Sequence, residues 1–116
     1  MNNYNKGAVF ERKVVYQLLE NGALSVVRAA GSKSYGKGKI DLVAFFKDSV
    51  WLVQCKRHGL VSWEEKKQGF ELAEELKSYA HFMLAYYKGG LHFTEFKNFF
   101  VKEGSDVKAQ MRMRFS

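Results

Sequence analysis

Two apolar segments joined by a short polar turn, in residues 40–56, constrain the fold of this chain more than any other feature. The first segment begins Ile40-Asp41, the turn is Lys47-Asp48-Ser49, and the second segment ends Gln54-Cys55-Lys56. Two apolar runs around a turn of this kind predict a β-hairpin. Both runs are apolar almost throughout, which is typical of strands covered on both faces. The sequence therefore predicts a hairpin in the middle of a sheet.

The ends of this hairpin carry polar side chains where a packing surface is expected. Successive side chains of a strand alternate between faces, so Gln54 and Lys56 point one way and Cys55 the other. Pairing places Asp41 on the neighbouring strand. A carboxylate, an amide oxygen and an ammonium group can then converge, an arrangement suited to a divalent metal ion beside a phosphate. We interpret Cys55, the single cysteine of the chain, as a buried apolar side chain that lacks a partner for a disulfide or a cysteine-based zinc site.

Helices and further strands are predicted on either side of the hairpin. Ser62 and Glu65 form a capping box that opens the second helix. Because this helix lets the chain cross over, the strand after it can pair in parallel with the second hairpin strand. Apolar spacing and glycine-rich breaks predict, in chain order, a helix over residues 4–21, a strand over 23–30, a loop rich in glycine and lysine over 31–39, a helix over 62–78, and strands over 81–87 and 91–96.

An excess of basic residues indicates a polyanionic partner. Lysine and arginine number 19 against 12 acidic residues, which gives a net charge of +7, and multiple phosphate contacts favour clustered cations. Nucleic acid is the first partner expected and an anionic membrane surface the second. No apolar run approaches the roughly 18 residues of a membrane span, and the N-terminus lacks the apolar core of a signal peptide. We therefore expect a cytoplasmic protein that forms a single domain, residues 1–116, in which residues 97–116 form a basic, aromatic tail.

Four short segments together resemble one nuclease family. They are, in chain order, Gly7-Ala8-Val9-Phe10-Glu11-Arg12, Val27-Arg28-Ala29-Ala30-Gly31-Ser32, Ile40-Asp41-Leu42-Val43-Ala44 and Val53-Gln54-Cys55-Lys56. In this order and at these spacings they resemble the archaeal-type Holliday junction resolvases of the PD-(D/E)XK nuclease superfamily, over residues 6–96. The resemblance implies an α/β fold of the restriction-endonuclease type, with a central mixed five-stranded sheet flanked by helices.

The resemblance also implies roles for individual residues. Glu11 and Asp41 match acidic members of a metal site for Mg²⁺, or for Mn²⁺ in its place. Gln54 takes the third position of that metal site, Lys56 matches the catalytic lysine, and Ser32 matches a serine that assists catalysis or contacts phosphate. The family acts as a homodimer whose two sites make paired nicks in four-way junction DNA, so the same partner and assembly are expected here. The basic residues expected near the DNA are Arg12, Arg28, Lys33, Lys37, Lys39 and Arg57.

Gln54 departs from the family, which usually has glutamate at this position. An amide oxygen still binds Mg²⁺ but brings no negative charge, so metal affinity is expected to fall and to depend more on Glu11 and Asp41. Taken without the resemblance, Glu11 is interpreted as an exposed partner for a neighbouring cation. Three functions stay open: a Mg²⁺-dependent junction resolvase, a junction- or DNA-binding module with weakened or lost cleavage, and a related nuclease that cuts other DNA.

Overall fold

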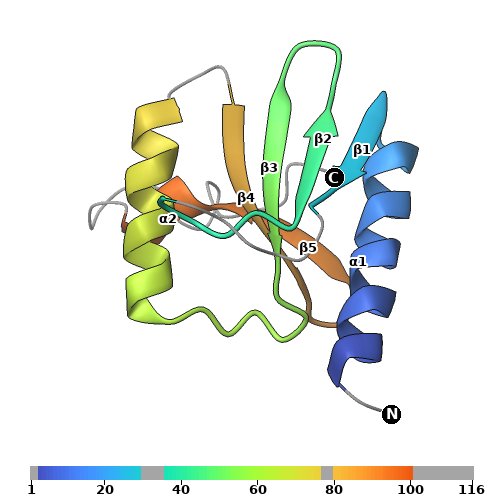
Figure 1. Cartoon of the computed structure of the whole chain (residues 1–116), viewed down its shortest axis with the longest axis horizontal. Helices are drawn as coiled ribbons and strands as arrows, with labels where there is room; N and C mark the ends of the chain where they lie inside the picture. The colour runs from blue at the N-terminus through green and yellow to red at the C-terminus, as the bar shows by residue number, and fades with distance from the viewer. Residues whose placement is uncertain (1–2, 30–35, 77–79, 101–116) are drawn as a thin grey trace.

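The computed structural model of the chain describes residues 3–29, 36–76 and 80–100. The five strands form one sheet in the order β1-β2-β3-β4-β5, in which β3 and β4 are parallel and the other neighbours are antiparallel. Within the described residues, no helix is both long and apolar enough to span a membrane. The predicted α/β fold, a mixed five-stranded sheet flanked by helices, is confirmed (Figure 1). The elements are α1 (Asn3–Glu20), β1 (Ser25–Arg28), β2 (Leu42–Phe45), β3 (Val50–Cys55), α2 (Trp63–Leu76), β4 (Ala80–Tyr87), β5 (Leu91–Glu95) and the 3₁₀-helix η2 (Phe96–Phe100).

The hairpin formed by β2 and β3 lies in the interior of the sheet, as its apolar sequence predicts. The two strands pair Leu42 with Val53 and Ala44 with Trp51, and all four side chains are buried. The Phe46 N–H donates to the Ser49 carbonyl at 2.8 Å and closes the turn. After β3 the chain crosses through α2 and returns as β4, parallel to β3. The open end of the hairpin, opposite the turn, therefore lies where β3 leads into the loop before α2 (Figure 1).

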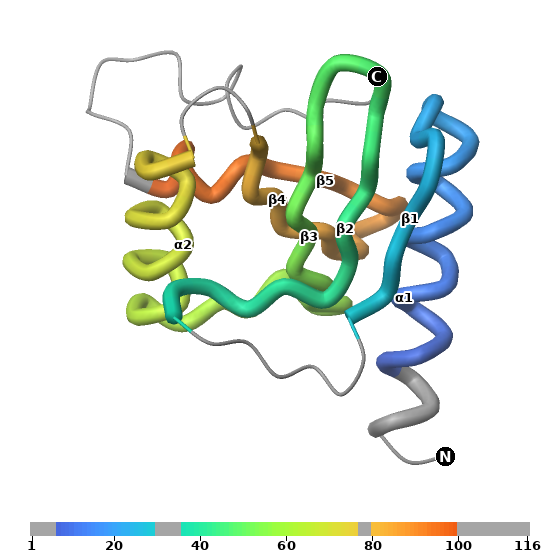
Figure 2. The backbone as a smooth tube through the Cα atoms, turned by 45° about the horizontal axis from the view of Figure 1, so that its top comes forward, coloured from blue at the N-terminus to red at the C-terminus, as the bar shows by residue number. Residues whose placement is uncertain are grey.

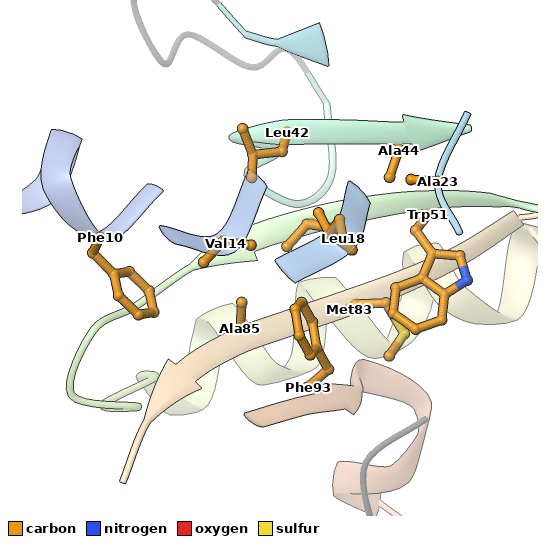
Figure 3. Packing of buried hydrophobic residues seen from close by; sticks show 11 residues of the cluster. Phe10, Val14, Leu18, Ala23, Leu42, Ala44, Trp51, Met83, Ala85 and Phe93 are labelled. Carbon is orange, nitrogen blue, oxygen red and sulfur yellow. The ribbon is translucent and has the colours of Figure 1, made fainter. Parts of the chain in front are cut away.

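Helix α1 covers one face of the sheet with a stripe of apolar side chains. Phe10, Val14 and Leu18 recur every four residues, which places them on one side of the helix, and none is more than 5% exposed. Figure 3 shows these side chains turned toward the sheet, where residues such as Met83 and Phe93 complete the cluster. Burial of this stripe fixes the rotation of α1. As a result, Glu11, the residue after Phe10, lies at the rim of the contact between α1 and the sheet.

Helix α2 covers the opposite face, as the two views in Figures 1 and 2 agree. Gly69 and Ala73 are its buried residues, and they face a second apolar cluster built on β4 and η2. Phe82 and Phe96 stack there with ring centroids 4.3 Å apart. The absence of a side chain at Gly69 makes room for the Phe96 ring. Close packing at this point holds α2 against β4 and η2.

Candidate active site

Asp41 and Gln54 face each other across the open end of the hairpin. The register of β2 and β3 pairs Leu42 with Val53, so the preceding Asp41 lies opposite Gln54, and its backbone N–H donates to the Val53 carbonyl at 2.8 Å. The Asp41 side chain then continues the ladder, because its Oδ2 accepts the Cys55 N–H at 2.8 Å. Both side chains are buried, with 5% of Asp41 and 2% of Gln54 exposed. The hairpin therefore brings these two predicted site residues together.

Glu11 reaches the same end of the sheet from α1. Its Oε1 lies 2.8 Å from Nε of Arg28, at the end of β1. The register of β1 and β2 pairs Arg28 with Leu42, the residue after Asp41, and burial, followed by the negative charges of Asp41 and Glu11, raises the pKa of the Cys55 thiol. The ion-pair partner of Glu11 thus comes from β1 and not from a neighbouring residue of its own helix. Arg28, expected near the DNA, is held by this ion pair while more than half of its side chain is exposed.

Lys56 and Gln54 both bind Glu65, which the sequence identified only as part of a helix cap. Glu65, in the first turn of α2, accepts the Gln54 Nε2–H through Oε2 at 3.0 Å. The same oxygen lies 3.1 Å from Lys56 Nζ. Its other oxygen, Oε1, accepts the Ser62 N–H at 3.1 Å, while the Glu65 N–H donates to Ser62 Oγ at 3.1 Å. The predicted capping box is therefore present, and its glutamate also binds the two polar residues at the end of β3.

These contacts keep Glu65 ionised. Burial opposes ionisation, but hydrogen bonds from the Ser62 N–H, Lys56 and Gln54, together with the positive charge of Lys56, outweigh it and lower the pKa of Glu65 to about 2. An ionised carboxylate accepts hydrogen bonds and donates none. The Gln54 amide must therefore turn its NH₂ toward Glu65, which leaves the carbonyl oxygen, Oε1, at the opposite side of the amide group. That oxygen is the atom of Gln54 with the chemistry of a metal ligand.

The basic residues predicted to lie near DNA are placed in different ways. Lys37 is half exposed and lies 3.1 Å from Glu71 Oε2, which ties the segment after residue 36 to α2. In Figure 2 this segment runs from α2 back to β2. Ser32 and Lys33 lie outside the described residues. The exposed members of the predicted set are Arg12, Lys37, Lys39, Arg28 and Arg57.

The donor chemistry at the strand ends fits a magnesium ion. Glu11 and Asp41 offer carboxylate oxygens and Gln54 an amide oxygen, and Mg²⁺ prefers hard oxygen ligands together with water. Asp41 uses Oδ2 for the Cys55 N–H, so Oδ1 is the atom that would face a cation. Within residues 3–29, 36–76 and 80–100, no three His, Cys, Asp or Glu side chains form a group that could hold a metal ion. The candidate set thus depends on the amide of Gln54 as its third ligand.

Glu65 is the residue of this arrangement that the sequence analysis did not assign to the site. The capping box located it at the start of α2, but the pattern gave no sign that this turn lies against the end of β3. One sequence signal points to such a residue: Gln54 is a polar side chain on a buried strand, and a buried amide requires hydrogen-bond partners. The first acidic residues after the strand, Glu64 and Glu65, were the candidates for such a partner.

Comparison with known proteins gives one family. The model of the archaeal Holliday junction resolvases, Hjc, matches residues 2–81, whereas a search of curated proteins finds no match. Among solved structures, the chain is similar to Hjc of the hyperthermophile Archaeoglobus fulgidus, described as a Holliday junction resolvase, with a TM-score of 0.55 and 22% sequence identity over 80% of this chain and 75% of that chain. The structural similarity supports the fold. Because the family model matches more than half of its length, this chain belongs to the archaeal Holliday junction resolvase family.

Proposed function

We propose that this protein is a Mg²⁺-dependent, structure-selective endonuclease that resolves four-way DNA junctions by paired nicks and acts as a homodimer. The observation that carries the proposal is the meeting of Asp41 and Gln54 at the open end of the hairpin, with Lys56 beside Gln54. Membership of a resolvase family supports the choice of substrate. The net charge of +7 supports a polyanionic partner.

Each residue of the site has a separate task in phosphodiester hydrolysis. Bound Mg²⁺ would neutralise charge on the scissile phosphate and lower the pKa of a water molecule, and Glu11, Asp41 and Gln54 are the residues that would hold it. Asp41 is oriented in advance by the Cys55 N–H, which removes the cost of ordering it during the reaction. Lys56 is one-third exposed, so its ammonium group can reach the phosphate and stabilise the charge that develops there. Ser32 remains a proposed phosphate contact.

A homodimer fits the symmetry of the substrate. A four-way junction needs two strands of like polarity to be cut, and two copies of one site related by a twofold axis provide two such cuts. Exposed basic side chains, among them Arg12, Lys39 and Arg57, are proposed to contact the DNA backbone. Sedimentation at micromolar concentration is expected to give a dimer, and a monomer under those conditions would contradict the assembly.

A junction-cleavage assay tests the proposed activity. The wild-type protein is expected to give symmetric nicks in a synthetic four-way junction with Mg²⁺ or Mn²⁺, whereas Asp41→Asn and Lys56→Ala are expected to give none. Asparagine keeps an oxygen for the Cys55 N–H, so the first variant tests charge and not folding. Lys47→Ala serves as the matched control, because Lys47 is exposed at the turn, at the other end of the hairpin. Unchanged cutting by both site variants would remove this site from the reaction.

A second candidate function is junction binding without cleavage. It is favoured by the neutral side chain at position 54 and by the ion pair that engages Lys56 with Glu65 at 3.1 Å. This function predicts tight, salt-sensitive binding with no nicks in either metal. A third, cleavage of other DNA, is separated from junction resolution by comparing flaps, ends and plain duplexes of equal length in the same assay.

A further inference from the structure

The two carboxylate oxygens of Glu65 have different partners. Oε1 accepts the Ser62 N–H and belongs to the helix cap. Oε2 accepts from Gln54 Nε2 at 3.0 Å and from Lys56 Nζ at 3.1 Å. A residue needed only to begin α2 would use the first oxygen alone. The second oxygen joins the helix to Gln54 of β3 and to Lys56, which directly follows β3, and the proposed reaction uses both residues.

The negative charge of Glu65 also lies beside position 54 of β3, which carries no charge. Position 54 is an amide, so β3 contributes a metal ligand without a negative charge, and Lys56 adds a positive charge one side chain further along the same face. Glu65 places an acidic group against both. Since opposite charges attract at this distance even with one-third of each side chain exposed, the carboxylate offsets the ammonium charge that would otherwise repel a metal cation.

The position of Glu65 determines how Gln54 is oriented. Gln54 is 2% exposed, and a buried amide is held in place by its hydrogen-bond partners. With Nε2 bound to Glu65, Oε1 is turned away from α2. If residue 65 were a neutral amide that also accepted the Ser62 N–H, its NH₂ group would face Gln54, and Gln54 would be favoured in the flipped orientation with Oε1 toward α2.

We propose that Glu65 is a positioning residue of the active site, which supplies from α2 the negative charge that position 54 lacks and directs the Gln54 carbonyl oxygen toward the metal position beside Asp41. This inference rests on the proposed function and deepens it. Glu65 acts through Gln54 and Lys56, and no contact between Glu65 and the substrate is required.

Two variants separate this role from helix capping. Glu65→Gln retains a residue that suits the third helical position of a capping box but removes the charge, so the protein is expected to stay folded. The double variant Gln54→Glu, Glu65→Gln moves the carboxylate to the strand and keeps one hydrogen bond between the two residues. Ser62→Ala is the control, because it removes the Oγ half of the cap and leaves Gln54 and Lys56 untouched.

The readouts are the junction-cleavage rate and the affinity for Mn²⁺ alone, measured by calorimetric titration without DNA. Loss of a residue that orients a metal ligand typically costs about 10- to 100-fold in affinity or activity. Glu65→Gln is expected to lose that much in both readouts, with kcat falling and KM for the junction little changed. The double variant is expected to recover most of both losses, and Ser62→Ala is expected to keep the wild-type values while its melting temperature falls.

The outcomes distinguish this inference from the proposed function. Wild-type protein that makes no nicks would overturn the proposed function, and the Mn²⁺ titrations of the same variants would still test Glu65. Wild-type cleavage together with unchanged rate and Mn²⁺ affinity in Glu65→Gln would overturn the role of Glu65 and leave the proposed function in place. A double variant no better than Glu65→Gln in either readout would also overturn it, since a merely structural glutamate is not replaced by one on β3.

Discussion

Gly69 is the position where a single methyl group is expected to disturb the fold most. An ideal Cβ on Gly69 would lie 2.7 Å from Cγ and 2.8 Å from Cε1 of Phe96, and closer still to Cδ1. Carbon atoms pack best at about 3.5–4.0 Å, so the ring must retreat by about 1 Å. It has little room to do so, because Phe96 is fully buried and stacks on Phe82 at a centroid distance of 4.3 Å.

The size of the effect of Gly69→Ala follows from two opposing contributions. Overpacking of a close-packed core costs about 1–3 kcal/mol. Replacing glycine by alanine inside a helix returns about 1 kcal/mol, because alanine loses less backbone entropy on folding. A Cβ at position 69 would lie too close to three ring atoms of the buried, stacked Phe96. We therefore expect a cost of overpacking in the upper part of its range. The free energy of unfolding is therefore expected to fall by about 1–2 kcal/mol.

Urea unfolding measures this difference. With a slope of about 1–3 kcal/mol per molar urea for a small domain, the midpoint of Gly69→Ala is expected to fall by about 0.3–2 M. Gly7→Ala is the matched control, because Gly7 is also inside a helix and exposed, and a Cβ there meets nothing within 4 Å. That control is expected to gain up to about 1 kcal/mol. If Gly69→Ala were as stable as Gly7→Ala, the steric reasoning would be wrong.

Three further predictions concern acid stability, a buried hydroxyl and the cysteine. The pKa of Glu65 is about 2 in the folded protein against an ordinary value of 4.5, so its contribution to stability is present above pH 4.5 and is lost as the pH falls toward 2. The melting temperatures of the wild type and of Glu65→Gln are therefore expected to converge as the solution is acidified. A difference that stays constant with pH would contradict this. Thr94 is 3% exposed, and its Oγ1 is buried without a hydrogen-bond partner among the described residues. Thr94→Val is therefore expected to raise the free energy of unfolding by about 1 kcal/mol. A loss of stability in this variant would argue against an unpaired hydroxyl. Burial and the negative charges of Asp41 and Glu11 raise the pKa of the Cys55 thiol. Iodoacetamide is therefore expected to label Cys55 in urea and not in the native protein at neutral pH. Fast labelling of the native protein would contradict a buried thiol beside negative charges.

Local patterns in the sequence predicted the elements of the fold because each depends on neighbouring residues. Apolar residues at steps of three and four predict a helix over residues 4–21, and α1 spans Asn3–Glu20. The apolar runs around residues 47–49 predict the hairpin, whose pairing then places Asp41 opposite Gln54. The ends of α1, the start of α2 and the end of the edge strand β5 differ from the prediction by one residue each, as is usual for the ends of helices.

Contacts between distant segments could not be predicted in the same way. Glu11 pairs with Arg28 of β1, and nothing in the sequence of α1 distinguishes that partner from a nearer cation. Glu65 was identified as a capping residue, which requires three residues of context, whereas its contact with Gln54 requires the loop before α2 to bring the first turn of the helix to the end of β3. The fit of Gly69 to Phe96 likewise depends on how η2 follows β5. Such contacts follow from packing of the whole sheet with both helices.

The neutral residue at position 54 has a different meaning once Glu65 lies beside it. From the sequence, Gln54→Glu restores the acidic residue usual in the family, and a gain in cleavage would be ascribed to that carboxylate alone. In the structure the new carboxylate would stand where Nε2 now meets Glu65 Oε2 at 3.0 Å. Two carboxylates this close do not both ionise readily unless a cation lies between them. The single variant would therefore add a negative charge to the metal ligand and disturb the Lys56 contact together, and a change in rate would not separate the two. Exchanging both residues keeps one negative charge and one hydrogen bond in the pair, so it isolates the position of the charge. The amide on β3 and the acid on α2 thus have to be interpreted as one unit.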